Sequence, residues 1–131
     1  MVIMNFRKFI TSSGKDVLAG KSAENNEEII KQVEDDETVL HTAKPGSPFV
    51  NIKSDYGETS KKDLKEAAVF CARYSKDWRD NRKDVEVHWF LGKEIFKTAG
   101  MKTGTFGVKK TRKIKVNKGE ILEFEDKISK K

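Results

Sequence analysis

The sequence is poor in the residues that build covalent or metal-bound sites. It has one cysteine, Cys71, and two histidines, His41 and His88, among 131 residues. A single cysteine excludes an internal disulfide and a four-thiolate zinc site, and it favours an intracellular protein. Two histidines and one cysteine, widely separated, give no cluster of metal ligands. We therefore expect neither a metal nor another cofactor.

Long apolar runs are missing as well. No stretch approaches the roughly 20 apolar residues that span a bilayer. The apolar start Met1–Met4 is too short for a secretory signal, and Lys8 follows soon after it. The sequence shows no internal repeat and no low-complexity linker. These absences favour a cytoplasmic protein without a membrane partner.

Charged residues, in contrast, are abundant. They make up 37% of the chain, the formal net charge is +6 and the pI is about 9.3. We expect a single domain over residues 1–131, with its core at about 5–118 and a C-terminal tail at about 119–131. The basic balance suits a polyanionic partner such as nucleic acid, although a merely soluble protein can share it.

Hydrophobic periodicity and turn residues predict an α+β fold. Helical spacing predicts one helix that begins at Ala23 after a Ser22 cap, and a second that follows a Thr59 or Ser60 cap and closes at residues 80–83. The alternating segment 85–91 predicts a strand with one buried face. Shorter strands are expected at 6–11, 17–19, 38–40, 49–52, 95–97, 105–109, 113–116 and 120–124. We expect one mixed, mostly antiparallel sheet with two main helices packed mainly on one side.

The connection at residues 41–49 lies between two of these strands and reads His-Thr-Ala-Lys-Pro-Gly-Ser-Pro-Phe. Its Pro-Gly pair is a turn signal, and the second proline fixes the backbone again. The connection therefore presents four polar side chains on a stiff strand end: His41, Thr42, Lys44 and Ser47. A binding loop and an ordinary hairpin connection fit this spacing equally well.

His41 has several possible roles within that connection. It could hydrogen-bond a ribose or a phosphate, stack on a base, act as a general base, or only fasten the loop. No nucleophile with a neighbouring base can be recognised around it, and Ser47 between Gly46 and Pro48 is not a nucleophile elbow. We therefore assign no catalytic residue.

The segment Gly20-Lys21-Ser22 is similar to the end of a phosphate-binding Walker A loop. Five residues separate Gly14 from Gly20, whereas that loop has four between its first glycine and its Gly-Lys pair, so the spacing argues against nucleotide hydrolysis. Lys21 and the amides of the helix start could still hold one phosphate. The alternative is a simple helix cap by Ser22, with glutamates in the first turn that repel an anion.

The strongest physical signal is a basic segment between Gly92 and Lys118. It holds nine lysines and arginines against one carboxylate, Glu94, which gives the segment a charge of +8 and leaves −2 for the rest of the chain. Phe96 and Phe106 are interleaved with these cations. Such a strip can lie along a phosphate backbone, or it can be a lysine-rich edge that prevents strands of different molecules from pairing.

Aromatic residues divide into two groups. Trp78 and Trp89 fall at apolar positions and are expected in the core. Tyr74, Phe90 and Phe106 are the better candidates for stacking on bases.

Five motifs, taken together, resemble one known family. They are Phe6 to Ser12, Gly20 to Glu27, His41-Thr42 with Pro45 to Phe49, Ala67-Ala68 through Tyr74-Ser75 to Trp78, and Lys97 through Gly104 to Phe106. In this order, over roughly residues 5–110, they resemble the NFACT-R domain, the predicted RNA-binding module of the ribosome-quality-control factors NEMF and RqcH, which also occurs as a small standalone protein. Ser22 departs from the pattern, because the family usually has Asp or Asn there.

The resemblance implies a standalone RNA-binding module near translation, with tRNA or rRNA and the large ribosomal subunit as partners. Two other classes stay open: an enzyme or accessory subunit in tRNA modification, and a protein–protein adaptor on the ribosome. The candidate RNA-contacting residues are Lys21, Ser22, His41, Thr42, Lys44, Ser47, Lys53, Lys97, Lys102, Lys109, Lys110, Arg112 and Lys113.

Overall fold

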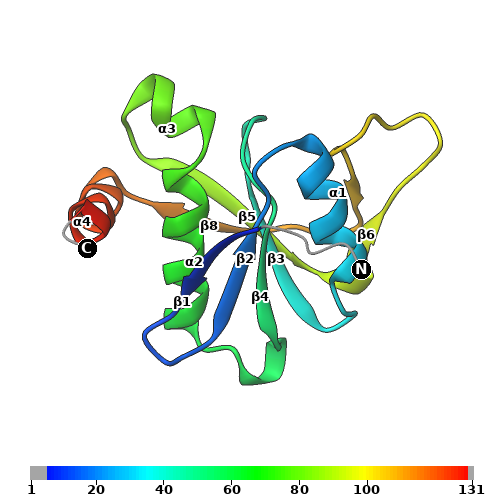
Figure 1. Ribbon diagram of the computed structural model, residues 1–131, viewed down its shortest axis with the longest axis horizontal. Coiled ribbons are helices and arrows are strands. Elements are labelled where there is room, and N and C mark those ends of the chain that lie inside the picture. Colours follow the sequence, from blue (N-terminus) through cyan, green and yellow to red (C-terminus); the bar gives the residue numbers. More distant parts are fainter. Residues whose placement is uncertain (1–5, 130–131) are drawn as a thin grey trace.

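The computed structural model describes residues 6–129 and consists of a twisted sheet with helices on both sides (Figure 1). The strands are β1 (Arg7–Ile10), β2 (Asp16–Ala19), β3 (Glu37–Thr42), β4 (Val50–Asp55), β5 (Val85–Leu91), β6 (Ile95–Phe96), β7 (Gly107–Val108) and β8 (Arg112–Val116). The α-helices are α1 (Ala23–Gln32), α2 (Lys61–Arg73), α3 (Lys76–Asn81) and α4 (Lys118–Ser129), and short 3₁₀ turns occupy Tyr56–Glu58 and Gly92–Glu94.

Six strands form the main sheet in the order β1-β2-β4-β3-β5-β8. Every pairing in it is antiparallel, so the predicted sheet, mixed and mostly antiparallel, is antiparallel throughout. Strands β6 and β7 form a separate two-stranded ribbon. The α+β class predicted from the sequence is confirmed.

Helix α2 covers one face of the sheet, together with α3 and α4. Its Ala67 and Ala68 are fully buried, which brings the helix close to the strands. Leu40 of β3 and Val87 of β5 point to this face, and Trp78 of α3 lies in the same cluster. This cluster is the larger of the two apolar cores.

Helix α1 lies on the opposite face. Its Ile29 packs with Val39 of β3, Phe49 and Phe90 in a second core. The prediction that the two main helices share one side is therefore wrong for α1. The reason is that β3 is apolar on both faces, Val39 on one and Leu40 on the other, so each face needs its own cover.

Two local predictions also differ from the structure. Residues 120–124, expected as a strand, lie in α4, because Asn117 and Glu120 cap each other's backbone amides at 2.9 Å and Ile121 is buried with Phe124 packed beside it. The long helix expected to end near residue 83 is divided into α2 and α3, because Ser75 interrupts it and caps α3. Among residues 6–129, no helix has the length and apolar character of a membrane span.

The start of α2 is hydrogen-bonded to the β1–β2 turn. Ser60 and Asp63 form a capping box, and Ser13 Oγ donates to Asp63 Oδ1 at 2.6 Å. Burial tends to raise the pKa of Asp63, but hydrogen bonds from Ser13, Ser60 and Thr11 outweigh it and lower the pKa from 3.8 to about 2.

This carboxylate should make folding acid-sensitive. Because the pKa of Asp63 is lower in the folded chain, its ionisation stabilises the fold above pH 3.8, and this contribution is lost as the pH falls to about 2. Asp63→Asn should lower the free energy of unfolding by about 2 kcal/mol at pH 7, with the difference shrinking between pH 4 and pH 2. Denaturant unfolding, followed by tryptophan fluorescence over a pH series, measures this.

Asp16→Asn is the matched control, because Asp16 is exposed; its effect should stay within about 0.5 kcal/mol. A deficit for Asp63→Asn that is equal at pH 2 and pH 7 would contradict an origin in the charge.

Candidate nucleic-acid interface

A hollow of about 770 Å³ lies where four segments distant in the sequence meet. They are the start of α1, the β3–β4 connection, the junction of α2 with α3, and the segment 104–111; strands β1 and β5 add Arg7, His88 and Phe90 to the lining. Figure 1 shows the β3–β4 connection rising between α3 and the start of α1. Because segments distant in the sequence form its walls, the hollow is a feature of the fold and more than a gap beside one loop.

The charged side chains that line the hollow all carry the same sign. Four are basic, Arg7, Lys21, Lys76 and Arg79, and the described lining contains no carboxylate. Two acids of α3 lie close by, but both are paired: Asp77 with Lys44 at 3.6 Å and Asp80 with Arg79 at 2.9 Å. The hollow is therefore suited to an anion.

The start of α1 is held by a set of short-range contacts. Ser22 Oγ accepts the amide of Asn25 and so caps the helix, as the sequence predicts. Asn26 Oδ1 accepts the amide of Phe49 at 3.0 Å, while the amide of Gly20 donates to the Phe49 carbonyl at 3.2 Å. A side chain at Gly20 would collide with Asn26. Lys21 is left exposed at the mouth of the hollow.

Glu27, one turn further along α1, fastens the loop after β6. It accepts hydrogen bonds from the ammonium of Lys97 and from the amide of Gly104, and these bonds lower its pKa. The Lys97 ammonium also lies 4.5 Å from the Phe106 ring centroid. The predicted RNA contact Lys97 is thus engaged within the fold.

The β3–β4 connection is held mainly by its own polar groups. Ser47 Oγ accepts the amide of Thr42 at 3.0 Å, and Thr42 Oγ1 donates to the carbonyl of Lys44 at 2.6 Å. Thr42 and Ser47 are both buried. Gly46 has φ +92°, and its carbonyl accepts the amide of Lys76 at 2.8 Å, which joins the connection to the start of α3. Of the four polar residues predicted here, only Lys44 is exposed on the surface.

His41 forms part of the floor of the hollow. Its ring stacks at a tilt on Phe49, with 4.6 Å between ring centroids. Burial lowers the pKa of His41, and Nδ1 lies 2.8 Å from the carbonyl of Thr42. A carbonyl can only accept, so Nδ1 carries the proton of the neutral ring and Nε2 remains an acceptor. His88 lies opposite His41 across β3 and β5 and lines the same hollow.

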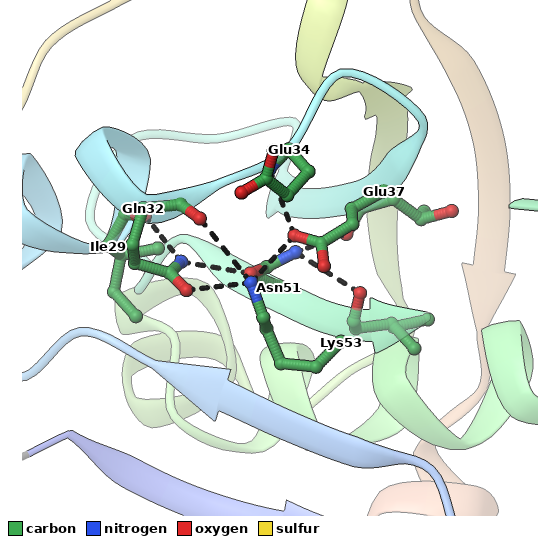
Figure 2. Close-up of polar contacts among 8 residues, drawn as sticks. Ile29, Gln32, Glu34, Glu37, Asn51 and Lys53 are labelled. Atoms are coloured by element: carbon green, nitrogen blue, oxygen red, sulfur yellow. Dashed lines mark hydrogen bonds and ion pairs between the residues drawn. The ribbon is translucent and has the colours of Figure 1, made fainter. Parts of the chain in front are cut away.

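Lys53 lies away from the hollow, in a polar network at the end of α1. Figure 2 shows its ammonium beside Glu37 and Gln32, at 2.8 Å from each side-chain acceptor. Gln32 also donates to the fully buried Asn51, at 2.9 Å. The network attaches α1 to β3 and β4, so the structure gives Lys53 a structural partner on another part of the surface.

The basic C-terminal segment is only partly free. Among residues 6–129, four of its nine cations form ion pairs: Lys93 with Asp36, Lys97 with Glu27, Arg112 with Glu94, and Lys115 with Asp84. Arg112 also lies 4.6 Å from the Trp89 ring centroid. Within the same residues no ion pair involves Lys102, Lys109, Lys110, Lys113 or Lys118.

Three of the free lysines of this segment lie next to the hollow. Lys109 and Lys110 stand between Val108 and Thr111, which both line it. Lys113 pairs across the sheet with His88, another lining residue. The segment therefore contributes both a wall of the hollow and exposed charge beside it.

Sequence reasoning missed three cations of the hollow, Arg7, Lys76 and Arg79. Arg7 belongs to a strand motif, and Lys76 and Arg79 fall within the segment predicted as one long helix, where no pattern singles them out. The predicted stacking residues Tyr74, Phe90 and Phe106 all line the hollow, but Phe90 is only 2% exposed and packs in the core. Nothing in the periodicity of the sequence tells which helix cations turn toward another segment.

The described residues offer little support for a metal site or a reactive thiol. In the described part of the chain, no three His, Cys, Asp or Glu side chains are grouped as metal ligands. Burial raises the pKa of the Cys71 thiol to about 12, so it stays protonated in the core.

Comparison with known proteins bears on this arrangement. Residues 5–110 match the family described as "NFACT protein RNA binding domain". This chain belongs to the NFACT-R family. An archaeal Rqc2 homolog, aRqcH of Methanocaldococcus jannaschii, is 34% identical over 110 residues, which are 80% of this chain and 16% of that protein. The C-terminal part of the fibronectin/fibrinogen-binding protein of Streptococcus suis has the same fold, with a TM-score of 0.79 and 20% identity over 94% of this chain and 50% of that one.

The motifs that resemble NFACT-R domains coincide with the contacts described above. Gly20, Asn26 and Glu27 each hold another segment against α1. Ser22, the position that departs from the family pattern, still supplies the helix cap. In this NFACT-R domain the Gly20–Glu27 motif therefore builds the hollow, while the charges that line it come mostly from elsewhere.

The tight approach at Gly20 gives a second testable prediction. Gly20→Ala should displace Asn26, leave the buried amide of Phe49 without its acceptor and lower the free energy of unfolding by about 2 kcal/mol. Gly57→Ala is the control, since nothing lies within 4 Å of the added carbon, and it should be close to neutral. Equal unfolding midpoints for the two variants would refute the close contact. Denaturant titration provides the measurement.

Proposed function

We propose that this chain binds structured RNA, tRNA or rRNA, in a setting linked to translation and the large ribosomal subunit. The observation that carries the proposal is the hollow whose lining, within residues 6–129, has four basic side chains and no carboxylate, beside lysines without an ion-pair partner in that range. Membership of a family of RNA-binding domains supports RNA as the polyanion. The chain spans 16% of the length of its archaeal relative. The role of that whole protein in ribosome quality control is therefore extended to this chain only as part of the proposal.

Electrostatic attraction to phosphates is the first part of the mechanism. Lys109, Lys110 and Lys113 carry no ion-pair partner among residues 6–129 and border the hollow, and Lys102 is exposed on the loop that leads into it. Lysines of this kind release counterions from RNA and fix its position without reading bases. We therefore expect selection by shape, with weak dependence on sequence.

Several residues predicted to contact RNA are instead engaged within the fold, so their role is to hold the interface in shape. The hydroxyls of Ser22, Thr42 and Ser47 are engaged in hydrogen bonds within the chain. Lys97, Arg112 and Lys53 are held by Glu27, Glu94 and Glu37. They keep the walls in place, while Lys21, Lys44 and the free lysines of the C-terminal segment meet the RNA.

A binding module accounts for the hollow better than an enzyme does. The His41 ring is neutral, bonds a backbone carbonyl and has no carboxylate beside it in the described lining. A general base also needs a proton to take, and the hydroxyls of Ser22, Thr42 and Ser47 in the lining are engaged in hydrogen bonds within the chain. We assign the hollow to binding.

The proposal predicts a salt-dependent affinity for tRNA that depends on the hollow. The double variant Lys21→Glu/Lys76→Glu should weaken binding at least tenfold and reduce the slope of log K against log salt by about 2, since each lost phosphate contact removes about one unit. Fluorescence anisotropy with labelled tRNA between about 50 and 200 mM salt measures both quantities.

Lys61→Glu/Lys62→Glu is the matched control. It changes the net charge equally, at exposed positions in the first turn of α2 where acids are favoured. If the control weakens binding as much as the hollow variant, the chain responds to overall charge and the hollow is not the interface. If tRNA and heparin bind equally weakly and neither variant matters, RNA binding itself is excluded.

A further inference from the structure

The hollow offers more than positive charge, because planar groups form part of its lining. The guanidinium carbon of Arg7 lies 4.0 Å from the centroid of the Tyr74 ring, and both residues line the hollow. Phe49 and Phe106, also in the lining, meet edge to face with 5.5 Å between centroids. A surface that only followed a phosphate backbone would have no need of such planes.

The size of the hollow limits what can enter it. A volume of about 770 Å³ falls in the range of sites that enclose a single small molecule, roughly 300–1,000 Å³. A base with its sugar and phosphate is of that order, whereas a double helix can only lie across the mouth. Bases within a helix are stacked and paired, so only an unpaired one is free to leave its strand.

We propose that the hollow receives one unpaired nucleotide of the bound RNA, with its phosphate met by Lys21 and Lys76 and its base stacked on the Arg7–Tyr74 pair. This inference rests on the proposed function and specifies its ligand. It requires a junction between double-stranded and single-stranded RNA, with the double-stranded part held by the lysines outside the hollow.

Neither of the two lysines is held in an ion pair within residues 6–129, although Lys76 lies near enough to Asp80 to help lower the pKa of that carboxyl. The stem of Lys76 lies against Gly46, so close that a carbon added to Gly46 would stand 2.5 Å from its Cδ. Arg79, by contrast, is already bonded to Asp80, so we expect a smaller contribution from it.

The Arg7–Tyr74 pair is suited to a base. Bases stack on aromatic rings and on guanidinium planes irrespective of their identity. Tyr74 is fixed from below by Phe70, which meets it edge to face at 5.3 Å, and Arg73 lies 4.9 Å from its centroid. The pair is therefore held before any ligand arrives, which reduces the entropy that binding would cost.

The test compares two RNA hairpins with the same stem, one blunt and one with a short single-stranded extension at its end. The extended hairpin should bind about tenfold more tightly. Arg7→Lys keeps the charge and removes the plane, so it should abolish most of this preference. Tyr74→Phe keeps the ring and should retain the preference, and circular dichroism confirms that each variant is folded.

The outcomes separate the inference from the proposed function. Equal affinity for both hairpins overturns the inference and leaves RNA binding intact. A preference that survives both Arg7→Lys and Lys21→Glu/Lys76→Glu also overturns it, because the single strand then binds elsewhere. Binding to neither hairpin, nor to tRNA, removes the proposed function and the inference with it. A preference lost in Arg7→Lys and kept in Tyr74→Phe supports the site as described.

Discussion

The arrangement of the hollow depends on how the first turn of α1 is attached to the β3–β4 connection. Both main-chain polar groups of the buried Phe49 are hydrogen-bonded at this end of α1. Asn26, in the helix, accepts its amide, and the amide of Gly20, just before the helix, donates to its carbonyl. A buried amide or carbonyl without a partner is costly, so the attachment is difficult to open. It fixes Lys21 beside the connection and leaves a rigid wall on which the other segments close.

A second constraint is the burial of the sheet on both faces. Central strand β3 alternates between two apolar cores, and α1 is needed on the face that α2 leaves open. The network around Asn51 anchors the end of α1 to the strands (Figure 2), while Asn26 anchors its start. A helix fixed at both ends can hold the loop after β6 through Glu27 and so complete the hollow.

The basic side chains also have two roles. Some stabilise the fold through ion pairs, and others are available to a partner. Acids from distant segments neutralise the cations that tie loops down, such as Lys97 and Arg112. Several cations without an ion-pair partner among residues 6–129, such as Lys21, Lys76 and Lys109, lie in or beside the hollow. A net charge of +6 understates this local field, since the described lining has no carboxylate. The local absence of acid, more than the total charge, makes this face suited to RNA.

The sequence by itself determined the elements whose signals are local. Ser22 and Ser60 mark two helix starts, the alternation at 85–91 marks β5, and the family motifs mark the segments that meet at the hollow. The prediction of a strand at 120–124 was wrong. The short apolar pattern of Ile121 and Phe124 is compatible with a strand or a helix, and tertiary packing selects the helix α4. Only the tertiary structure showed which cations are free, because an ion pair such as Lys97 with Glu27 joins residues far apart in the chain. The same holds for Arg7 and Lys76: their place in one hollow follows from packing across the sheet, which no local pattern encodes.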